Sequence, residues 1–207
     1  MLITLADFQS LIDKAVDYKE YSSLVRKYLF HGLPAVFENR ENDYYDFRAE
    51  IADRWKVRFH EVLILGSAKL GYSYYKKTQF SIESDIDVSI VSPILFEEFV
   101  EAISETQYKI DKGQVRLTQY EQARYDKFLK YLVKGWMRPD LLPSNMGGII
   151  NRDNWFDYFR SISYGKSQVG NYKISAGLFK NFDYMEKYYV ESLKASRSNE
   201  TNTVKSE

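Results

Sequence analysis

Residues 62–92 read VLILGSAKLGYSYYKKTQFSIESDIDVSIVS, and both apolar runs in this stretch carry polar residues at one end. The run VLIL closes on Gly66-Ser67, as expected of a short buried strand that ends in a turn. The run IDVSIV is rich in β-branched residues and indicates a second strand. Asp85 and Asp87 therefore stand at the start of a segment that otherwise favours burial.

The spacing of Asp85 and Asp87 predicts that their carboxylates share one face, because residues i and i+2 of a strand point the same way, about 6–7 Å apart. Two like charges held together are costly unless a cation lies between them. With no Cys or His beside them, oxygen ligands favour Mg²⁺ or Mn²⁺. Two such ions about 3.5–4 Å apart would stabilise the entering and leaving oxygens of a phosphoryl transfer.

Gly66 and Ser67 predict the other half of such a site. A glycine after a buried strand lets the backbone approach a ligand closely. A helix that starts at Ser67 would direct free N–H groups and its positive end toward phosphate. The Ser67 hydroxyl could donate to a phosphate oxygen, and Lys69 could add charge. The two strand ends together predict a nucleoside-triphosphate site.

These motifs resemble the DNA polymerase β-type nucleotidyltransferase superfamily, whose signature is an apolar strand, Gly-Ser, and then Ser-Asp-x-Asp in a second apolar strand. Here they stand as LILGSAKLGYS and ESDIDVSIV, within roughly residues 60–92. The resemblance implies that Gly66 and Ser67 bind nucleotide and that Asp85 and Asp87 bind metal and are catalytic. The implied reaction transfers a nucleoside monophosphate from a (d)NTP to an acceptor hydroxyl.

The chain departs from the family pattern in two respects. The 17 residues between Ser67 and Asp85 are more than minimal members use; the added YSYYKKTQF is interpreted as a surface loop or, alternatively, as a flank of the nucleotide. The family also carries a third acidic residue on a later strand, often as the base for the acceptor hydroxyl. Asp140 in WMRPDLLP is the predicted third acid, with Asp111 second and a turn residue as the alternative for Asp140.

A wider similarity to bacterial nucleotidyltransferases of anti-phage defence clusters is carried by GSAKLGYS, SDIDVSIVSP and GWMRPDLLP. It implies a nucleotide or short oligonucleotide signal as the product and an effector or toxin protein as a partner. Two alternatives stay open: an enzyme that nucleotidylates a protein or small molecule, and a non-catalytic nucleotide-binding or antitoxin-like module. The absence of an obvious third acid keeps the last one open.

Single features of the sequence also have interpretations other than a nucleotidyltransferase site. Taken alone, the Asp pair is compatible with structural roles, in which Asp85 belongs to a turn and Asp87 lies on an exposed strand face. It is also compatible with the metal-binding DxD motif of glycosyltransferases, but that interpretation leaves Gly-Ser unexplained. The calcium loop of an EF-hand is excluded because IDVSIV lacks its glycine and downstream glutamate. The cluster YGKS at residues 164–167 is typical of a surface turn, with base stacking and phosphate contact as its alternative.

Composition limits the class of protein. Hydrophobic residues make up 44% of the 207 residues and charged residues 28%, as in soluble globular domains. A net charge of zero argues against strong duplex-DNA binding. The chain has no cysteine, which excludes disulfides and thiol catalysis. No apolar run approaches the ~18 residues of a membrane span, and the start lacks signal-peptide features, so we expect a cytoplasmic protein without membrane insertion.

The periodicity predicts an α/β (α+β) fold in which a small mixed sheet is flanked by N- and C-terminal helices. We expect an N-terminal helical segment over residues 1–58, a core with C-terminal helices over 59–193 and a disordered tail over 194–207. Expected helices span residues 4–30 with a break near 17–22, 44–55, 95–103, 118–133, 155–162 and 182–193. Expected strands span residues 61–65, 86–91, 114–117 and 172–179.

Overall fold

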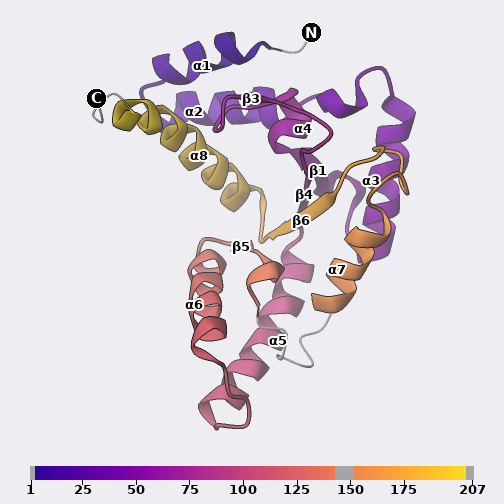
Figure 1. The fold of residues 1–207 in the computed structure, drawn as a ribbon, viewed down its shortest axis with the longest axis vertical. Helices are drawn as coiled ribbons and strands as arrows, with labels where there is room; N and C mark the ends of the chain where they lie inside the picture. The colour runs from indigo at the N-terminus through magenta and orange to yellow at the C-terminus, as the bar shows by residue number, and fades with distance from the viewer. Residues whose placement is uncertain (1–2, 143–151, 204–207) are drawn as a thin grey trace.

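The computed structural model describes the backbone of residues 3–142 and 152–203, and within these ranges all side chains except those of residues 140, 152, 153 and 198–203 (Figure 1). Its centre is a four-stranded sheet in the order β1-β4-β6-β5. β4 is antiparallel to β1 and parallel to β6, and β5 is antiparallel to β6. The predicted α/β class with a mixed sheet is confirmed.

The strands of this sheet are β1 (Val62–Leu65), β4 (Ile86–Val91), β5 (Trp136–Met137) and β6 (Ile174–Phe179), and a separate hairpin consists of β2 (Tyr72–Ser73) and β3 (Thr78–Gln79). The α-helices are α1 (Leu5–Lys14), α2 (Tyr18–Leu24), α3 (Glu41–Trp55), α4 (Gly66–Leu70), α5 (Pro93–Asp111), α6 (Gln119–Val133), α7 (Arg152–Ser161) and α8 (Phe182–Thr203). A π-helical segment, η1 (Val25–Phe30), and the 3-10 turns η2 (Ala35–Phe37), η3 (Phe59–Glu61) and η4 (Pro139–Leu141) complete the elements.

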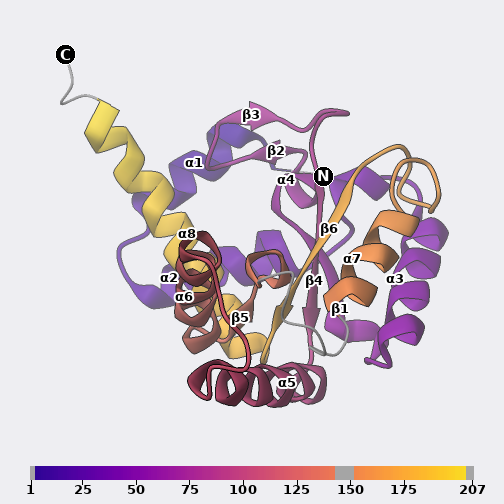
Figure 2. The same ribbon diagram turned by 60° about the horizontal axis from the view of Figure 1, so that its bottom comes forward.

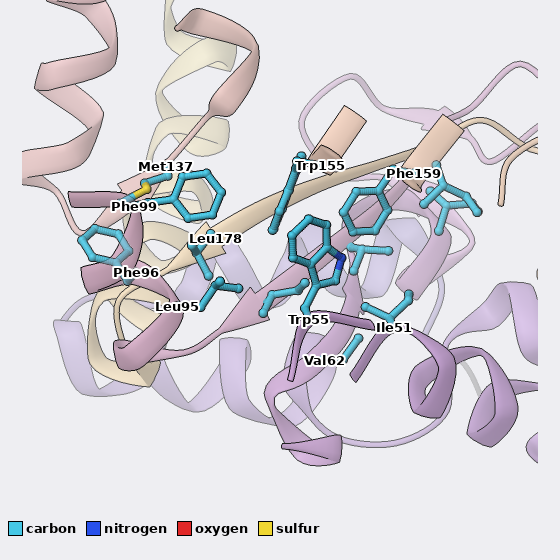
Figure 3. Close-up of a cluster of buried hydrophobic side chains, with 14 of the residues drawn as sticks. Ile51, Trp55, Val62, Leu95, Phe96, Phe99, Met137, Trp155, Phe159 and Leu178 are labelled. Carbon is cyan, nitrogen blue, oxygen red and sulfur yellow. The ribbon is translucent and has the colours of Figure 1, made fainter. Parts of the chain in front are cut away.

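Helices cover both faces of the sheet. Figure 2 shows α3 and α7 on one side and α1, α2 and α8 on the other, with α5 across one end. The first side holds the larger hydrophobic core, in which Trp55 and Trp155 lie with ring centroids 4.7 Å apart, near Phe159 (Figure 3). The second side holds a smaller cluster that joins Phe8 and Ile12 of α1 to Met185 and Val190 of α8. The sheet is therefore buried between two cores, which fixes the position of its strand ends.

The N-terminal helical region forms as predicted, but the break falls earlier than expected. The first helix ends at Lys14, and the second begins after Asp17, whose side chain accepts a hydrogen bond from the Glu20 N–H at 2.9 Å. The Glu20 carboxylate in turn accepts from the Val16 N–H at 2.6 Å. This local capping satisfies the free N–H groups of a helix start and explains why the chain breaks here.

Three further details differ from the expectations. Residues 114–117 do not form the predicted strand, because the Gln114 and Val115 N–H groups donate to the Lys109 carbonyl and close the end of α5. The segment YSYYKKTQF, interpreted as a loop, contains the β2–β3 hairpin. The helix expected over residues 95–103 is longer and spans Pro93–Asp111.

The C-terminal helix also corrects a prediction. Residues 194–207 were expected to be disordered, but α8 continues to Thr203; residues 204–207 lie outside the described range. Extending an existing helix costs less than starting one, and tertiary contacts support this extension. Ser196 is buried, and the Arg197 guanidinium donates to the Ala15 carbonyl at 3.1 Å. The contact ties α8 to the end of α1.

An Arg197→Ala variant should lose about 1 kcal/mol of unfolding free energy, because it removes a charged donor from the Ala15 carbonyl. Urea denaturation followed by circular dichroism would measure the change. Lys187→Ala, at an exposed position of the same helix, is the matched control and should change stability by less than about 0.5 kcal/mol. Equal effects in the two variants would contradict a stabilising role for the Arg197 contact.

Candidate functional site

Gly66 lies directly against the Asp87 carboxylate. β1 ends at Leu65, which is opposite Asp87 in the antiparallel register with β4. At Gly66 the backbone adopts φ +64°, a left-handed conformation that favours glycine, and the chain turns at once into α4. A Cβ on Gly66 would lie 2.6 Å from Asp87 Oδ2. Two motifs separated by 20 residues of sequence are therefore parts of one site.

Asp85 interacts with Lys173, which directly precedes β6, and Asp87 interacts with Ser175 of β6. Because β4 and β6 are parallel, with Asp87 opposite Ser175, the polar residues at the two strand starts lie side by side. The Lys173 ammonium is 2.8 Å from Asp85 Oδ2, and the Ser175 hydroxyl donates to Asp87 Oδ1 at 3.2 Å. The carboxylates thus share their face of the sheet with a cation and a hydroxyl.

The two carboxylates differ in their surroundings. Asp87 is accessible to solvent within the hollow, but surrounding protein atoms displace part of its hydration, and this burial is the main cause of its raised pKa. The neighbouring Asp85 charge also raises the pKa of Asp87, whereas the Ser175 hydrogen bond and the charges of Lys173 and Lys76 lower it. Because the nearby positive charges only partly compensate these two neighbouring carboxylates, the pair favours the binding of a further cation.

These residues open into one hollow of about 1270 Å³. Gly66, Ser67, Asp85 and Asp87 all line it, so the structure brings four of the six sequence-predicted site residues together. The charged side chains that line the hollow are carboxylates and cations that come from separate elements. The carboxylates suit a divalent cation, and the cationic side chains suit an anionic ligand that binds together with it. The charged lining residues are Lys76, Glu83, Asp85, Asp87, Arg138, Arg160 and Lys173.

Aromatic residues form much of the remaining wall. Trp136 and Tyr188 line the hollow with ring centroids 4.5 Å apart, and Tyr74 and Tyr189 line it as well. The Tyr74 hydroxyl is hydrogen-bonded to Ser192 at 2.8 Å, which joins the β2–β3 hairpin to α8. Tyr74 belongs to YSYYKKTQF, for which a position beside the nucleotide was the alternative to a surface loop, whereas Trp136, Tyr188 and Tyr189 were not assigned to the site. The count of 18 tyrosines does not say which rings face a ligand.

Lys69 does not line the hollow. It is 4% exposed, and its ammonium donates to the His31 carbonyl at 2.6 Å and the Gly32 carbonyl at 2.5 Å. Burial lowers the pKa of Lys69 to about 8. This placement does not support its predicted contact with phosphate. The side chain instead connects α4, and hence the Gly-Ser turn, to the chain that follows η1.

Neither residue predicted as the third acid is placed among the described side chains of the hollow, where Glu83 is the one described carboxylate besides Asp85 and Asp87. The backbone of Asp140 lies in η4, but its side chain lies outside the described set, so the prediction for it remains a prediction. Asp111 is at the end of α5, accepts a hydrogen bond from Gln107 at 2.8 Å and does not line the hollow. Across the described side chains, no three or more His, Cys, Asp or Glu residues gather as a metal-binding group.

The Lys173–Asp85 ion pair predicts competition with divalent cations. A Lys173→Gln variant should bind Mn²⁺ several-fold more tightly in the absence of nucleotide, because Asp85 would lose a competing cation. The variant should bind inorganic triphosphate more weakly, because it removes a positive charge from the hollow. Its unfolding free energy should differ from that of the wild type by less than about 1 kcal/mol, because the Lys173–Asp85 pair is exposed. Titration calorimetry would measure both affinities, with Lys166→Gln, an exposed neighbour, as control. Unchanged Mn²⁺ affinity would contradict the competition.

The described helices include none with the length and hydropathy that a membrane span requires. Comparisons of the chain with protein-family models, with curated proteins and with solved structures find no match. The functional assignment therefore depends on the residues of the hollow and on their geometry.

Proposed function

We propose that this protein is a metal-dependent nucleotidyltransferase that transfers a nucleoside monophosphate from a (d)NTP to an acceptor hydroxyl. The observation that carries the proposal is the contact between Gly66 and Asp87 within a hollow that Ser67 and Asp85 also line. A turn with accessible backbone suits the β- and γ-phosphates, and a carboxylate pair suits the cation that accompanies them.

The donor set fits Mg²⁺ or Mn²⁺. Mg²⁺ is commonly held by one or two carboxylates while substrate phosphates and water complete its octahedron. Asp85 and Asp87 supply the two carboxylates, and the hydroxyls of Ser67 and Ser175 add oxygen atoms nearby. Bound there, the ion would neutralise charge on the phosphate oxygens and on the departing pyrophosphate.

The chain's own residues then have distinct roles in the proposed reaction. Gly66 and Ser67 hold the β- and γ-phosphates, and Lys173 and Arg138 contribute positive charge to the hollow. The acceptor oxygen attacks the α-phosphorus, a new P–O bond forms, and the bond from the α-phosphorus to its bridging oxygen breaks. Pyrophosphate leaves with the bonding electron pair, and the acceptor proton passes to water.

One observation favours a second candidate, a nucleotide-binding module without catalysis. The residues beside Asp85 and Asp87 at the start of β6 are Lys173, which directly precedes the strand, and Ser175, and neither is a carboxylate. A site with two carboxylates and a competing lysine can bind Mg²⁺ and nucleotide without a side-chain base for the acceptor proton. The implied defence role and an effector or toxin partner remain predictions from the resemblance.

A labelling experiment separates these candidates. The purified protein would be incubated with each α-³²P-labelled NTP and dNTP and Mg²⁺ or Mn²⁺, beside Asp85→Asn and Asp87→Asn variants. A labelled small product or ladder that is lost in the variants would support nucleotide transfer to a nucleotide or small acceptor. Label on the protein would support nucleotidylation of protein. Binding without any label would favour the non-catalytic module.

A further inference from the structure

Helix α6 carries a row of basic and aromatic side chains along one side. The members of this row follow one another at intervals of four and three residues, so they share one face of the helix. This α6 face consists of Tyr120, Arg124, Lys127, Tyr131 and the C-cap residue Lys134. The helix buries Tyr125 and Phe128 on another side, whereas the α6 face borders solvent and its Tyr120 is 69% exposed. In Figure 1, α6 lies at the margin of the molecule, away from α3 and α7.

The two carboxylates of α6 lie off this face. Glu121 and Asp126 project more than a quarter of a turn away from Tyr120 around the helix, because successive residues differ by about 100°. Both also have local partners: the Glu121 carboxylate accepts from the Thr118 N–H at 2.9 Å, and Asp126 accepts from Gln122 at 2.8 Å. The helix itself therefore does not neutralise the cations of the α6 face.

The acidic residues of the neighbouring helix α5 are also directed elsewhere. The Tyr125 hydroxyl donates to the Gln107 side chain at 2.9 Å, which marks the side of α5 that contacts α6. Of the exposed glutamates of α5, Glu98, Glu101 and Glu105 lie at least about a third of a turn from Gln107. Although the whole chain has a net charge of zero, positive charge is thus concentrated on the α6 face.

The length of the α6 face suits an extended polyanion. From Tyr120 to Lys134 it is about 21 Å long, at about 1.5 Å per residue. A strand of nucleic acid with stacked bases carries one phosphate per about 3.4 Å, so about six nucleotides cover this length. Arg124, Lys127 and Lys134 supply positive charge along it. A row of cations of this length can follow the backbone of one strand.

The two tyrosines of the α6 face have different surroundings. Tyr131 is half-buried and makes an edge contact with Trp136, with ring centroids 4.9 Å apart, so it packs against the protein. Tyr120 is the exposed ring of the face, and the Arg124 guanidinium lies 5.6 Å from its centroid. Nucleobases stack on exposed aromatic side chains whatever their identity, and a nearby arginine adds to such contacts. Tyr120 therefore offers a stacking surface at one end of the row of cations.

We propose that the α6 face is a docking surface for single-stranded nucleic acid, whose phosphates pair with Arg124, Lys127 and Lys134 while a base stacks on Tyr120. A single strand fits better than an acidic peptide, because its phosphates are evenly spaced and its bases use the exposed ring. A duplex fits less well, because the chain has no excess of positive charge. The residues of the α6 face do not line the hollow, so the inference does not depend on the proposed function.

Fluorescence anisotropy tests the proposal without turnover. The full chain would be titrated into labelled single strands of about 12 nucleotides, twice the length that covers the face, without NTP or divalent cation. We expect binding that weakens as salt is raised. Lys127→Glu/Lys134→Glu should weaken it at least about ten-fold and reduce its salt dependence, because two phosphate contacts are lost. Tyr120→Ala should weaken it about five- to a hundred-fold, as for loss of one stacked base, and Tyr120→Phe should retain it.

Matched variants elsewhere on the surface control for general charge and aromatic effects. Lys14→Glu/Lys19→Glu, at exposed lysines beside α1 and α2, and Tyr108→Ala, at an exposed tyrosine of α5, should keep wild-type affinity within about two-fold. Circular dichroism would show that every variant is folded.

Three results would overturn the inference. The first is no binding of any single strand at about 100 μM protein, which is the weak end of non-specific affinities. The second is equal weakening by the Lys14→Glu/Lys19→Glu control. The third is inorganic polyphosphate or polyglutamate that binds as tightly as the single strand, together with unchanged binding in Tyr120→Ala, since it would assign the α6 face to an acidic protein partner. Each of them leaves the proposed function standing, because nucleotide transfer in the hollow is measured separately.

Discussion

Nucleotidyl transfer should fall about a thousand-fold or more in the Asp87→Asn variant, a loss of about 4 kcal/mol of transition-state stabilisation. Asp87 is the carboxylate that touches the Gly-Ser turn and shares the hollow with Asp85. An amide keeps the shape of the side chain but removes the charge that would hold the divalent cation. Initial rates with α-labelled NTP, for whichever nucleotide the wild type uses, would measure the loss.

The same substitution should not destabilise the fold. The pKa of Asp87 is raised in the folded protein, mainly by burial and then by the Asp85 charge. At pH values above the ordinary pKa of an aspartate, ionised Asp87 therefore destabilises the folded state relative to the unfolded state. Asparagine removes this penalty, so the variant should be at least as stable as the wild type at pH 7. The difference should shrink as pH falls through the raised pKa, where the wild-type Asp87 becomes protonated.

The raised pKa of Asp87 also determines how the nucleotidyltransferase activity should change with pH. The protonated form of Asp87 cannot hold a cation, so wild-type activity should decline on acidification at a higher pH than an ordinary aspartate would cause. Thermal unfolding at each pH separates this effect from denaturation. An Asp87→Asn variant that is folded and still transfers nucleotide at the wild-type rate would exclude Asp87 from catalysis.

The strands and the motif that joins them were predictable from the sequence because their signals are local. A short apolar run closed by Gly66, and a β-branched run that starts at Ile86, are sufficient to predict β1 and β4. Both were confirmed, as was the helix over Gln119–Val133, whose Thr118–Glu121 capping box marks its start. What the sequence could not supply was the partner of each strand.

Residues whose roles depend on tertiary placement were missed for that reason. Ser175 looks ordinary in the six-residue strand β6, as does Lys173 directly before it, and only the parallel pairing with β4 brings the two residues to Asp87 and Asp85. Lys69 follows the Gly-Ser turn closely in sequence, but a helical turn directs its ammonium to the carbonyls at His31 and Gly32 instead of the hollow. Local pattern does not determine such long-range contacts.

The Gly66→Ala variant should reduce nucleotidyl transfer at least about a hundred-fold, because a Cβ at this position would lie 2.6 Å from Asp87 Oδ2. The carboxylate would have to move, and a displacement of about 1 Å in a catalytic group can cost about a hundred-fold in rate. Alanine also disfavours the φ of +64° by about 1–2 kcal/mol, so some loss of unfolding free energy is expected in addition.

Gly113→Ala separates the steric effect from the backbone strain. Gly113 has φ +70°, close to that of Gly66, but a Cβ there meets nothing within 4 Å. Gly66→Ala should therefore lose at least as much unfolding free energy in urea titrations as Gly113→Ala, and only Gly66→Ala should lose transfer and binding of a Mg²⁺–nucleotide complex. If the two variants lose stability equally and both retain wild-type transfer, the close approach of Gly66 to Asp87 has no part in the reaction. A selective loss in Gly66→Ala would show that the glycine serves the carboxylate that lies against it.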